Sequence, residues 1–140
     1  MKADVFLDSN VFLYAAANVE KEAEKKRAAL RLIAETEFGT SVQVLGEFFD
    51  NARRKAKLGI PPETTRAILQ LLKSRPVVDE TLGLFEKAVN LAERYGVRYY
   101  DAAITAAAQE LGATTLFTED LSHGQSYGGV KVINPFHGIE

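Results

Sequence analysis

The sequence predicts an α/β fold with a central parallel sheet covered by helices on both faces, and three observations predict it. Short apolar runs such as residues 5–7 alternate with longer segments in which apolar residues recur every three or four positions. Parallel neighbouring strands need crossover connections, which are usually helices. Acidic residues directly follow the first and fourth predicted strands, at Asp8 and at Glu119 and Asp120, where open α/β sheets collect their ligands.

Length and composition indicate a single globular domain over residues 1–140. The chain is 46% hydrophobic and 26% charged, and 140 residues can bury a sizeable core. Cysteine is absent, which excludes disulfides and thiolate zinc sites and suits a reducing cytoplasm. No targeting leader or bilayer-length apolar run is recognisable, so we expect a cytoplasmic protein without a membrane partner. The net charge of -2 means that a polyanion must bind a local patch.

The first half of the chain should alternate short strands with amphipathic helices. We expect a strand over residues 5–7, a helical turn over 11–17, a helix over 20–36, a short strand or helix entry at 39–41, and a helix over 42–58. The helix over 20–36 should face the core with Ala23, Leu30, Ile33 and Ala34. Alternating lysines and glutamates in its first half indicate a solvated face with pairs four residues apart.

Glycines and prolines divide the second half into further elements. Gly59 ends one helix, and Pro61 and Pro62 begin the next, which runs through Leu72. We then expect a minimal strand over 76–78, a helix capped by Thr81 and closed by Gly96, an alanine-rich helix over 101–111, a strand over 115–118, a loop over 121–129, and an edge strand over 130–133.

Four carboxylates stand where predicted elements begin or end, or beside an apolar stripe: Asp8, Glu47, Asp101 and Asp120. The aspartates also have plain structural explanations, as the start of a turn with Asn10, as a helix cap and as a loop residue respectively. Brought together without a cation, such groups would repel and raise one another's pKa values. Hard cations such as Mg²⁺ or Mn²⁺ prefer carboxylate oxygen and bridge to substrate phosphate, so the set predicts a metal ion.

Glu47 lies just outside the apolar stripe of the helix predicted over 42–58. At about 100° per residue, this stripe contains Val44, Leu45, Phe48, Phe49, Ala52 and Ala56. Asn51 and Arg54 continue the line of Glu47 along the helix. The alignment resembles the wall of a groove in which the carboxylate faces a metal and basic residues meet phosphates, namely Arg54 with Arg53, Lys55 and Lys57. A solvated alignment with a basic helix end is the alternative.

Four motifs follow one another along the chain: Asp8-Ser9-Asn10, the helix around Glu47, Tyr100-Asp101-Ala102-Ala103-Ile104, and Thr118-Glu119-Asp120 with the tail that continues to Phe136. In this order they resemble the PIN domain superfamily and, within it, the VapC-type ribonuclease toxins. The resemblance covers essentially the whole chain. A lone Asp-x-Asn carries little weight, whereas the ordered set with this tail is specific.

The resemblance implies a three-layer α/β/α sandwich and a Mg²⁺- or Mn²⁺-dependent endoribonuclease that hydrolyses RNA phosphodiester bonds. It maps the catalytic and metal-binding positions onto Asp8, Glu47, Asp101 and Asp120. Asn10 and Thr118 match supporting polar positions that fix the carboxylates. A homodimer and a small antitoxin that inserts a peptide into the groove are also implied. Arg98 departs from the small hydroxyl residue of many relatives, and we expect it near the metal site or RNA phosphate, or on the surface.

Other assignments stay open at this point. An aspartate after the first strand also begins phosphatases of the haloacid dehalogenase type, but their chemistry needs a second aspartate where this chain has Asn10. A PIN nuclease of RNA processing is another possibility, as is a non-catalytic binding module that would not bind Mn²⁺ through these acids. His123 and His137 lie in predicted loops and are interpreted as local hydrogen-bonding residues.

Overall fold

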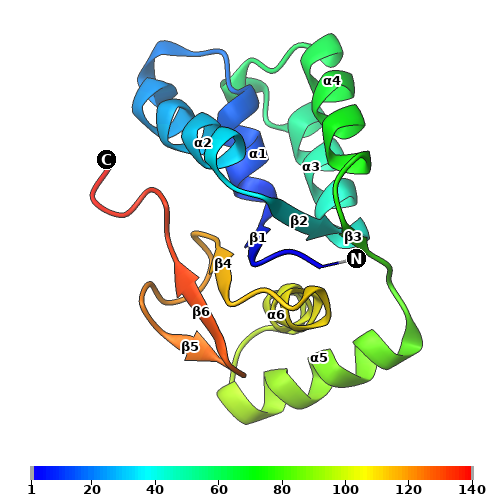
Figure 1. Ribbon diagram of the computed structural model, residues 1–140. Coiled ribbons are helices and arrows are strands. Elements are labelled where there is room, and N and C mark those ends of the chain that lie inside the picture. The colour runs from blue at the N-terminus through cyan, green and yellow to red at the C-terminus, as the bar shows by residue number, and fades with distance from the viewer. Residues whose placement is uncertain (1, 140) are drawn as a thin grey trace.

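The computed structural model describes residues 2–139 and contains six strands and six α-helices in that range (Figure 1). The strands are β1 (Val5–Leu7), β2 (Phe38–Ser41), β3 (Val77–Val78), β4 (Thr115–Phe117), β5 (Ser126–Tyr127) and β6 (Val130–Ile133). The helices are α1 (Ser9–Ala16), α2 (Ala23–Glu35), α3 (Val42–Arg54), α4 (Pro62–Lys73), α5 (Leu82–Tyr95) and α6 (Tyr99–Leu111). None of the helices in this range is both long and apolar enough to cross a membrane.

The strands form one sheet in the order β3-β2-β1-β4-β6-β5. β1 lies inside the sheet, where Val5 pairs with Phe38 of β2 on one side and with Thr115 of β4 on the other. The strand pairs are parallel except for β5 with β6. The alternating α/β prediction is confirmed. The expected edge position of residues 130–133 is wrong, because residues 126–127, which were expected to be loop, add a short antiparallel strand outside them.

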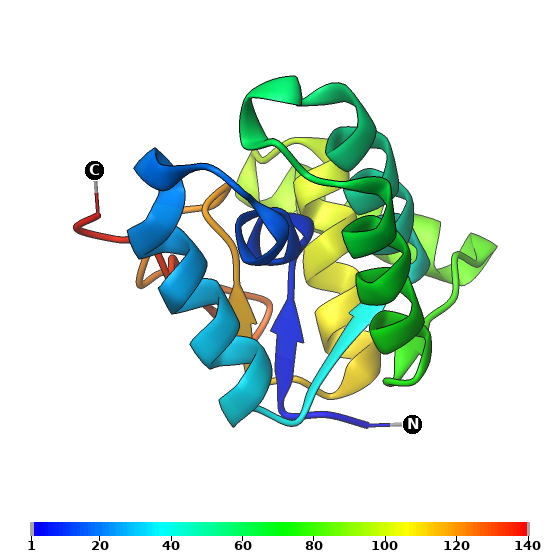
Figure 2. The same ribbon diagram turned by 90° about the horizontal axis from the view of Figure 1, so that it is seen from above.

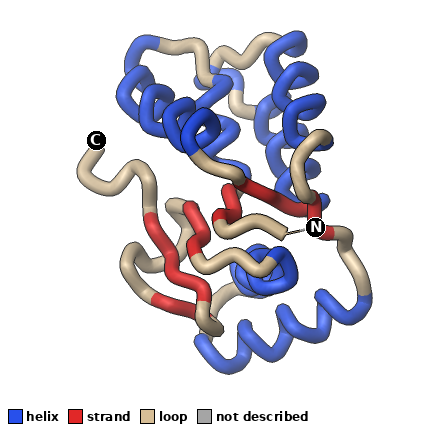
Figure 3. Tube along the Cα trace, in the orientation of Figure 1, coloured by secondary structure: helices blue, strands red, loops and turns tan. Residues whose placement is uncertain are grey.

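Helices cover both faces of the sheet, which gives the predicted three-layer α/β/α arrangement (Figures 1 and 3). α1, α2, α3 and α4 lie together over one face, and α6 lies against the other with α5 packed outside it. Phe6 on β1 is fully buried, and the rings of Phe12, Phe38 and Phe48 are buried in the same core. α6 is buried on nearly every side, since its alanines let it fit between the sheet and α5.

α2 turns a different stripe to the core than the sequence predicted. A 3₁₀ turn at Glu20–Glu22 precedes the helix, so the α-helix begins only at Ala23. Ala29 is fully buried, whereas Leu30 is 46% exposed and Ala34 is exposed as well. The prediction of Leu30 and Ala34 as core residues is therefore wrong. α2 packs against α1, and the way the two helices meet decides which apolar side chains of α2 are buried. The sequence pattern of α2 alone does not predict how they meet.

α3 is shorter than predicted and less buried at one edge. It ends at Arg54, because Lys55 leaves the helical conformation (φ -89°, ψ 75°) before a 3₁₀ turn at Ala56–Leu58. Within the predicted stripe, Phe49 is 44% exposed and Ala56 is exposed, so both predictions of burial are wrong. The apolar stripe of α3 is wider than the surface that α1 and β2 cover.

The helix starts and stops agree better with the sequence. Ser41 and Thr81 cap α3 and α5, each accepting a hydrogen bond from the backbone N–H three residues on. Residues 39–41 are thus both strand and helix entry. Gly96 and Gly112 end α5 and α6 with positive φ angles of 65° and 82°, which glycine adopts without strain.

Candidate active site

The four acids of the sequence prediction lie around one end of the sheet, at the carboxyl ends of β1 and β4. Figure 2 shows β1 leading directly into α1, with β4 beside it. Asp8 joins β1 to α1, and Asp120 follows shortly after β4. Glu47 belongs to α3 and Asp101 to the first turn of α6. The fold thus collects at one sheet end the four side chains that are far apart in sequence, as expected for parallel strands.

Asp8 is the most deeply buried of the four acids, with 3% exposure. One carboxylate oxygen accepts from the Ser9 backbone N–H at 2.7 Å and so caps α1, and the other accepts from the Thr118 hydroxyl at 2.7 Å. Burial raises the pKa of Asp8 from its ordinary value of 3.8 to about 7, against these two hydrogen bonds. The negative charges of Asp120 and Glu47 make smaller contributions to this raised pKa. The ionised Asp8 therefore lacks a compensating positive charge.

Asn10 connects Asp120 to the same network. Its Nδ2 donates to Asp120 Oδ2 at 3.3 Å and to the Thr118 hydroxyl oxygen at 3.4 Å, and that oxygen also accepts from the Asp120 N–H at 3.1 Å. A chain of hydrogen bonds thus runs from Asp8 through Thr118 and Asn10 to Asp120. Asn10 Oδ1 is buried and has no hydrogen-bond partner among residues 2–139. This oxygen is left free to accept from, or bind, a group that enters the site.

Glu47 is held by Ser9 and Gln43, which the sequence motifs did not predict as site residues. Its Oε1 accepts from the Ser9 hydroxyl at 3.3 Å, and its Oε2 accepts from Gln43 Nε2 at 3.1 Å. Gln43 Nε2 also donates to the backbone carbonyl of Tyr100 in α6 at 3.2 Å. The available signal for Gln43 was its position four residues before Glu47, which places both side chains on one face of the helix.

Asp101 lies in the first turn of α6, and the explanation of Asp101 as the helix cap is wrong, because Arg98 occupies the cap position. Burial raises the pKa of Asp101, the charges of Asp120 and Glu47 add to this, and Arg98 opposes it. A groove of about 460 Å³ opens beside these residues and is lined by Arg98, Asp101, Asp120, Ser122 and Tyr127 among others. Of the residues predicted to contact RNA, Arg98 is therefore the one that lines the same groove as Asp101 and Asp120.

The donor set of this site suits a hard divalent cation by its chemistry. The four acids supply carboxylate oxygens, and Asn10 supplies an amide oxygen that has no partner among residues 2–139. Burial raises the pKa values of Asp8 and Asp101, and repulsion between the acids adds to this, so a cation would lower the cost of ionising them. As the side chains lie, no three histidine, aspartate or glutamate residues in the described range stand close enough to enclose an ion. The carboxylate oxygens of Asp8, Glu47 and Asp120 are instead held by Ser9, Asn10, Gln43 and Thr118.

Of the other residues predicted to contact phosphate, Arg53 and Arg54 are exposed at the end of α3, and Lys55 and Lys57 lie in the segment directly after it. Arg54 pairs with Asp50 at 3.3 Å, and both side chains are largely exposed. The guanidinium of Arg53 lies over the Phe49 ring, 5.2 Å from its centroid. Asn51 is half-buried on the side of α3 that carries Glu47. Arg53 and Arg54 therefore have protein partners of their own and lie outside the groove beside Asp101.

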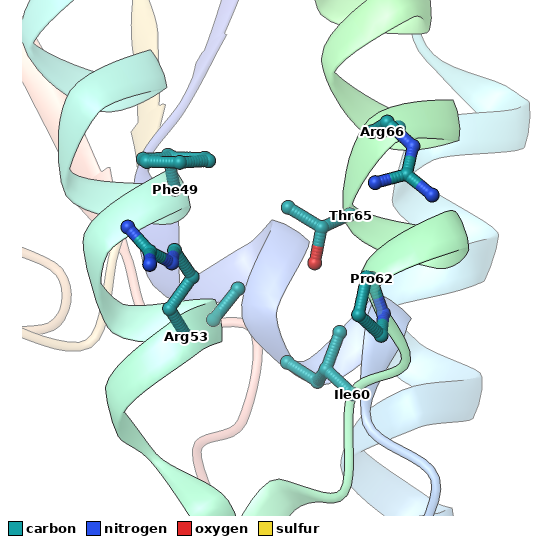
Figure 4. Close-up of a pocket in the computed structure, with 7 residues that line it drawn as sticks. Phe49, Arg53, Ile60, Pro62, Thr65 and Arg66 are labelled. Atoms are coloured by element: carbon teal, nitrogen blue, oxygen red, sulfur yellow. The ribbon is translucent and has the colours of Figure 1, made fainter.

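A second hollow of about 410 Å³, which we call the α3/α4 pocket, lies between these two helices (Figure 4). It is lined by Phe49, Ala52, Arg53, Ile60, Pro62, Thr65 and Arg66. Its walls are mostly apolar, with two arginines among the lining residues. Thr65 is 5% exposed, and its hydroxyl points into the hollow. None of the four acids lines this pocket.

The two histidines contact each other in the tail. Their rings stack with centroids 4.1 Å apart, and His123 Nδ1 accepts from the backbone N–H of Asn134 at 3.0 Å. The interpretation of His123 as a local hydrogen-bonding residue is confirmed. His137 is exposed on the other side of this stack.

A sequence model of the family described as PIN domain matches residues 5–125 of the chain. The chain belongs to the PIN domain family. No curated protein sequence matches it. Family membership removes the basis for the phosphatase alternative, which depended on the position of Asp8 alone.

Solved structures with the same fold as this PIN domain include several toxins. A toxin-antitoxin complex from Klebsiella pneumoniae has a TM-score of 0.67 at 17% identity, covering 94% of this chain and 97% of the other. VapC20 from Mycobacterium tuberculosis, described as a sarcin-ricin loop cleaving toxin, has a TM-score of 0.68 at 21% identity and covers 91% and 98%. VapBC2 from Rickettsia felis, bound to a DNA fragment from its promoter, has a TM-score of 0.59 at 20% identity and covers 91% and 96%. At these identities the likeness is one of fold.

Proposed function

We propose that this PIN domain is a Mg²⁺- or Mn²⁺-dependent endoribonuclease and the toxin of a toxin-antitoxin pair. The observation that carries the proposal is the gathering of four acids at one end of the sheet, where a buried aspartate is raised in pKa partly by its acidic neighbours. Repulsion of this kind is a cost unless a cation offsets it. The likeness to VapC20 supports RNA as the substrate and hydrolysis as the reaction. The proposal treats residues 1–140 as one nuclease domain in the cytoplasm.

In this proposal Asp8 and Asp101 hold the principal metal ion, and Glu47 and Asp120 complete its site. When bound, a divalent cation activates a coordinated water and stabilises negative charge on the phosphoryl oxygens. The Thr118 hydroxyl and the Asn10 amide orient Asp8 and Asp120, and they keep both carboxylates directed to the same end of the sheet. No side chain is needed as a covalent nucleophile.

RNA is proposed to lie along the groove lined by Arg98 and Asp101. The guanidinium of Arg98 offers the phosphate backbone a positive charge next to the acids, which otherwise repel it. Asn51 and Arg54, on the side of α3 that carries Glu47, extend the contact along the helix, whereas Arg53 lines the α3/α4 pocket on the other side. Because the whole chain has a net charge of -2, these local groups must supply the electrostatic attraction.

A small antitoxin and a second copy of the chain are the proposed protein partners. The antitoxin is supported by the likeness to complexes from Klebsiella pneumoniae and Rickettsia felis. The α3/α4 pocket suits an apolar side chain flanked by acidic residues, because its apolar walls lie beside Arg53 and Arg66. Exposed apolar side chains on α5 and α6 support a dimer, with Leu82 75%, Phe85 48% and Tyr100 58% exposed.

The deciding experiment is RNA cleavage by the purified chain with and without Mn²⁺. Cleavage should require the cation, and Asp8→Ala or Asp101→Asn should reduce it roughly 10³-fold, because several kcal/mol of transition-state stabilisation are lost. Glu35→Gln, a change in an exposed acid at the end of α2, should leave it unchanged.

Full metal-dependent cleavage by Asp8→Ala would contradict the assignment of the site. Wild-type chain that neither binds Mn²⁺ nor alters any RNA would favour a non-catalytic binding module. Mapping RNA ends after induction separates a toxin from an RNA-processing nuclease, since a toxin should arrest growth as the new ends appear.

A further inference from the structure

Gln43 spans the proposed active site from one helix to another. Its single amide nitrogen has two protons, and it directs one to Glu47 Oε2 at 3.1 Å and the other to the Tyr100 carbonyl at 3.2 Å. Glu47 belongs to α3, and Tyr100 is the residue directly before Asp101 in α6. One side chain thus connects the positions of two of the four acids.

The contact from Gln43 is the shorter of the two that hold Glu47. The Ser9 hydroxyl reaches the other carboxylate oxygen only at 3.3 Å. A glutamate side chain has three rotatable bonds, and it loses this freedom only where neighbours fix its carboxylate. Without Gln43, Glu47 would be held on one oxygen by one neutral hydroxyl and would be free to turn away from Asp101.

We propose that Gln43 is a positioning residue that fixes the Glu47 carboxylate opposite Asp101 and so sets the spacing of the metal ligands. The inference rests on the proposed metal-dependent nuclease and adds a residue that no sequence motif assigns. Gln43 acts through Glu47, because its amide N–H groups donate to the Glu47 carboxylate and to the Tyr100 carbonyl.

Gln43→Met tests this role, because methionine keeps the length of the side chain and its helix propensity but donates no hydrogen bond. The protein should fold with a nearly unchanged melting temperature, since Gln43 is only half-buried. Its Mn²⁺ affinity, measured from the electron paramagnetic resonance signal of free Mn²⁺, should fall roughly tenfold, as for other residues that orient metal ligands. RNA cleavage should need more Mn²⁺ for half-maximal rate, while the rate at saturating Mn²⁺ falls much less.

Gln70→Met is the matched control, because Gln70 is an exposed glutamine on α4. It should change neither Mn²⁺ affinity nor cleavage. In a Glu47→Ala background, Gln43→Met should cause no further loss of Mn²⁺ affinity, since its effect passes through Glu47. Gln43→Ala repeats the test with a smaller side chain in case methionine disturbs folding.

Unchanged Mn²⁺ affinity in Gln43→Met and Gln43→Ala would overturn the inference, and so would losses that add in full to those of Glu47→Ala. These outcomes differ from a failure of the proposed function. In that case the wild-type chain itself would neither bind Mn²⁺ nor cleave RNA.

Discussion

The two sides of α3 face opposite kinds of surroundings. Glu47 and Phe49 are two residues apart, and at about 3.6 residues per turn they project from nearly opposite sides of the helix. On the side of Glu47 lie the four acids, buried hydroxyls and the Asn10 amide oxygen, which has no partner among residues 2–139. On the side of Phe49 lies the α3/α4 pocket, with apolar walls and two arginines. Between the two sides, Val44, Phe48 and Ala52 are buried in the core.

This difference shows what each side of the helix requires from a ligand. The acidic side has excess negative charge that destabilises the protein until a cation or proton neutralises it. The apolar side has no such electrostatic cost. It exposes the Phe49 ring and the apolar walls of the pocket to solvent. The buried stripe between them stabilises the fold. The three predictions below test this separation of roles, beginning with the largest expected effect.

Phe48→Ala and Phe49→Ala should differ most, although the residues are neighbours. Phe48 is fully buried and packs edge-on to Phe12, so its loss should lower the free energy of unfolding by about 3–5 kcal/mol. Phe49 is 44% exposed, and its loss should cost less than about 1 kcal/mol. Urea unfolding of the two variants measures both values.

Phe49→Ala should in return weaken the complex with the antitoxin, while RNA cleavage by the free protein stays unchanged. Calorimetric titration of wild-type and variant protein with the antitoxin measures this effect. Equal loss of stability in both variants would show that the α3/α4 pocket belongs to the core. Unchanged antitoxin affinity would remove the pocket from the partner's binding surface.

The pH dependence of stability should report the charge on the acidic side. Folding raises the pKa of Asp8 from 3.8 to about 7, so the folded protein holds a proton that the unfolded chain releases between these values. The free energy of unfolding should therefore fall from about pH 4 to pH 7 and level off above. At pH 8 Asp8→Asn should be more stable than the wild type by on the order of 2–4 kcal/mol.

Added Mg²⁺ sharpens the same experiment. At pH 8 it should stabilise the wild-type protein, because it binds the folded state and compensates the ionised carboxylates. Asp8→Asn should respond much less. Urea unfolding between pH 4 and pH 8, with and without Mg²⁺, gives all four curves. A wild-type stability that rises with pH through this range would contradict the burial of a charged Asp8.

Arg98→Ala should have the smallest effect. Arg98 lowers the pKa of Asp101 and lies in the groove proposed for RNA, so its removal should raise the KM for RNA about fivefold, equivalent to roughly 1 kcal/mol. The maximal rate should change little. Steady-state cleavage at saturating Mn²⁺ measures both constants, and Arg31→Ala on α2 is the control for a lost exposed charge. A fall in the maximal rate alone would place Arg98 at the reacting phosphate.

Local signals predicted much of the fold. Ser41 and Thr81 act at helix starts and Gly96 and Gly112 at helix ends, because capping depends on a few neighbouring residues. The registers of α2 and α3 were harder to predict. Leu30 and Phe49 fit an apolar stripe, but a stripe is covered only as far as the neighbouring helices extend.

The candidate site divides in the same way. The position of Asp8 after a buried strand and of Asp101 near the start of an alanine-rich helix follows from hydrophobic runs and helix boundaries, although the helix begins two residues earlier than predicted. The roles of Ser9 and Gln43 could not be predicted in this way. Ser9 donates to Glu47 in α3 and Gln43 donates to Tyr100 in α6, so both contacts join elements that are far apart in the sequence. Hydrogen bonds between side chains depend on distances that only packed elements establish.

The sequence by itself determined the alternation of strands and helices, the acids at the strand and helix ends, and the likeness to PIN domains, since all of these are recorded in local order along the chain. Only the tertiary structure decided which strand lies at the edge, which aromatic ring stays exposed, and how Asp8, Glu47 and Asp120 influence one another. Burial and electrostatic coupling are properties of neighbours in space, and elements far apart in the chain become neighbours only when the sheet forms.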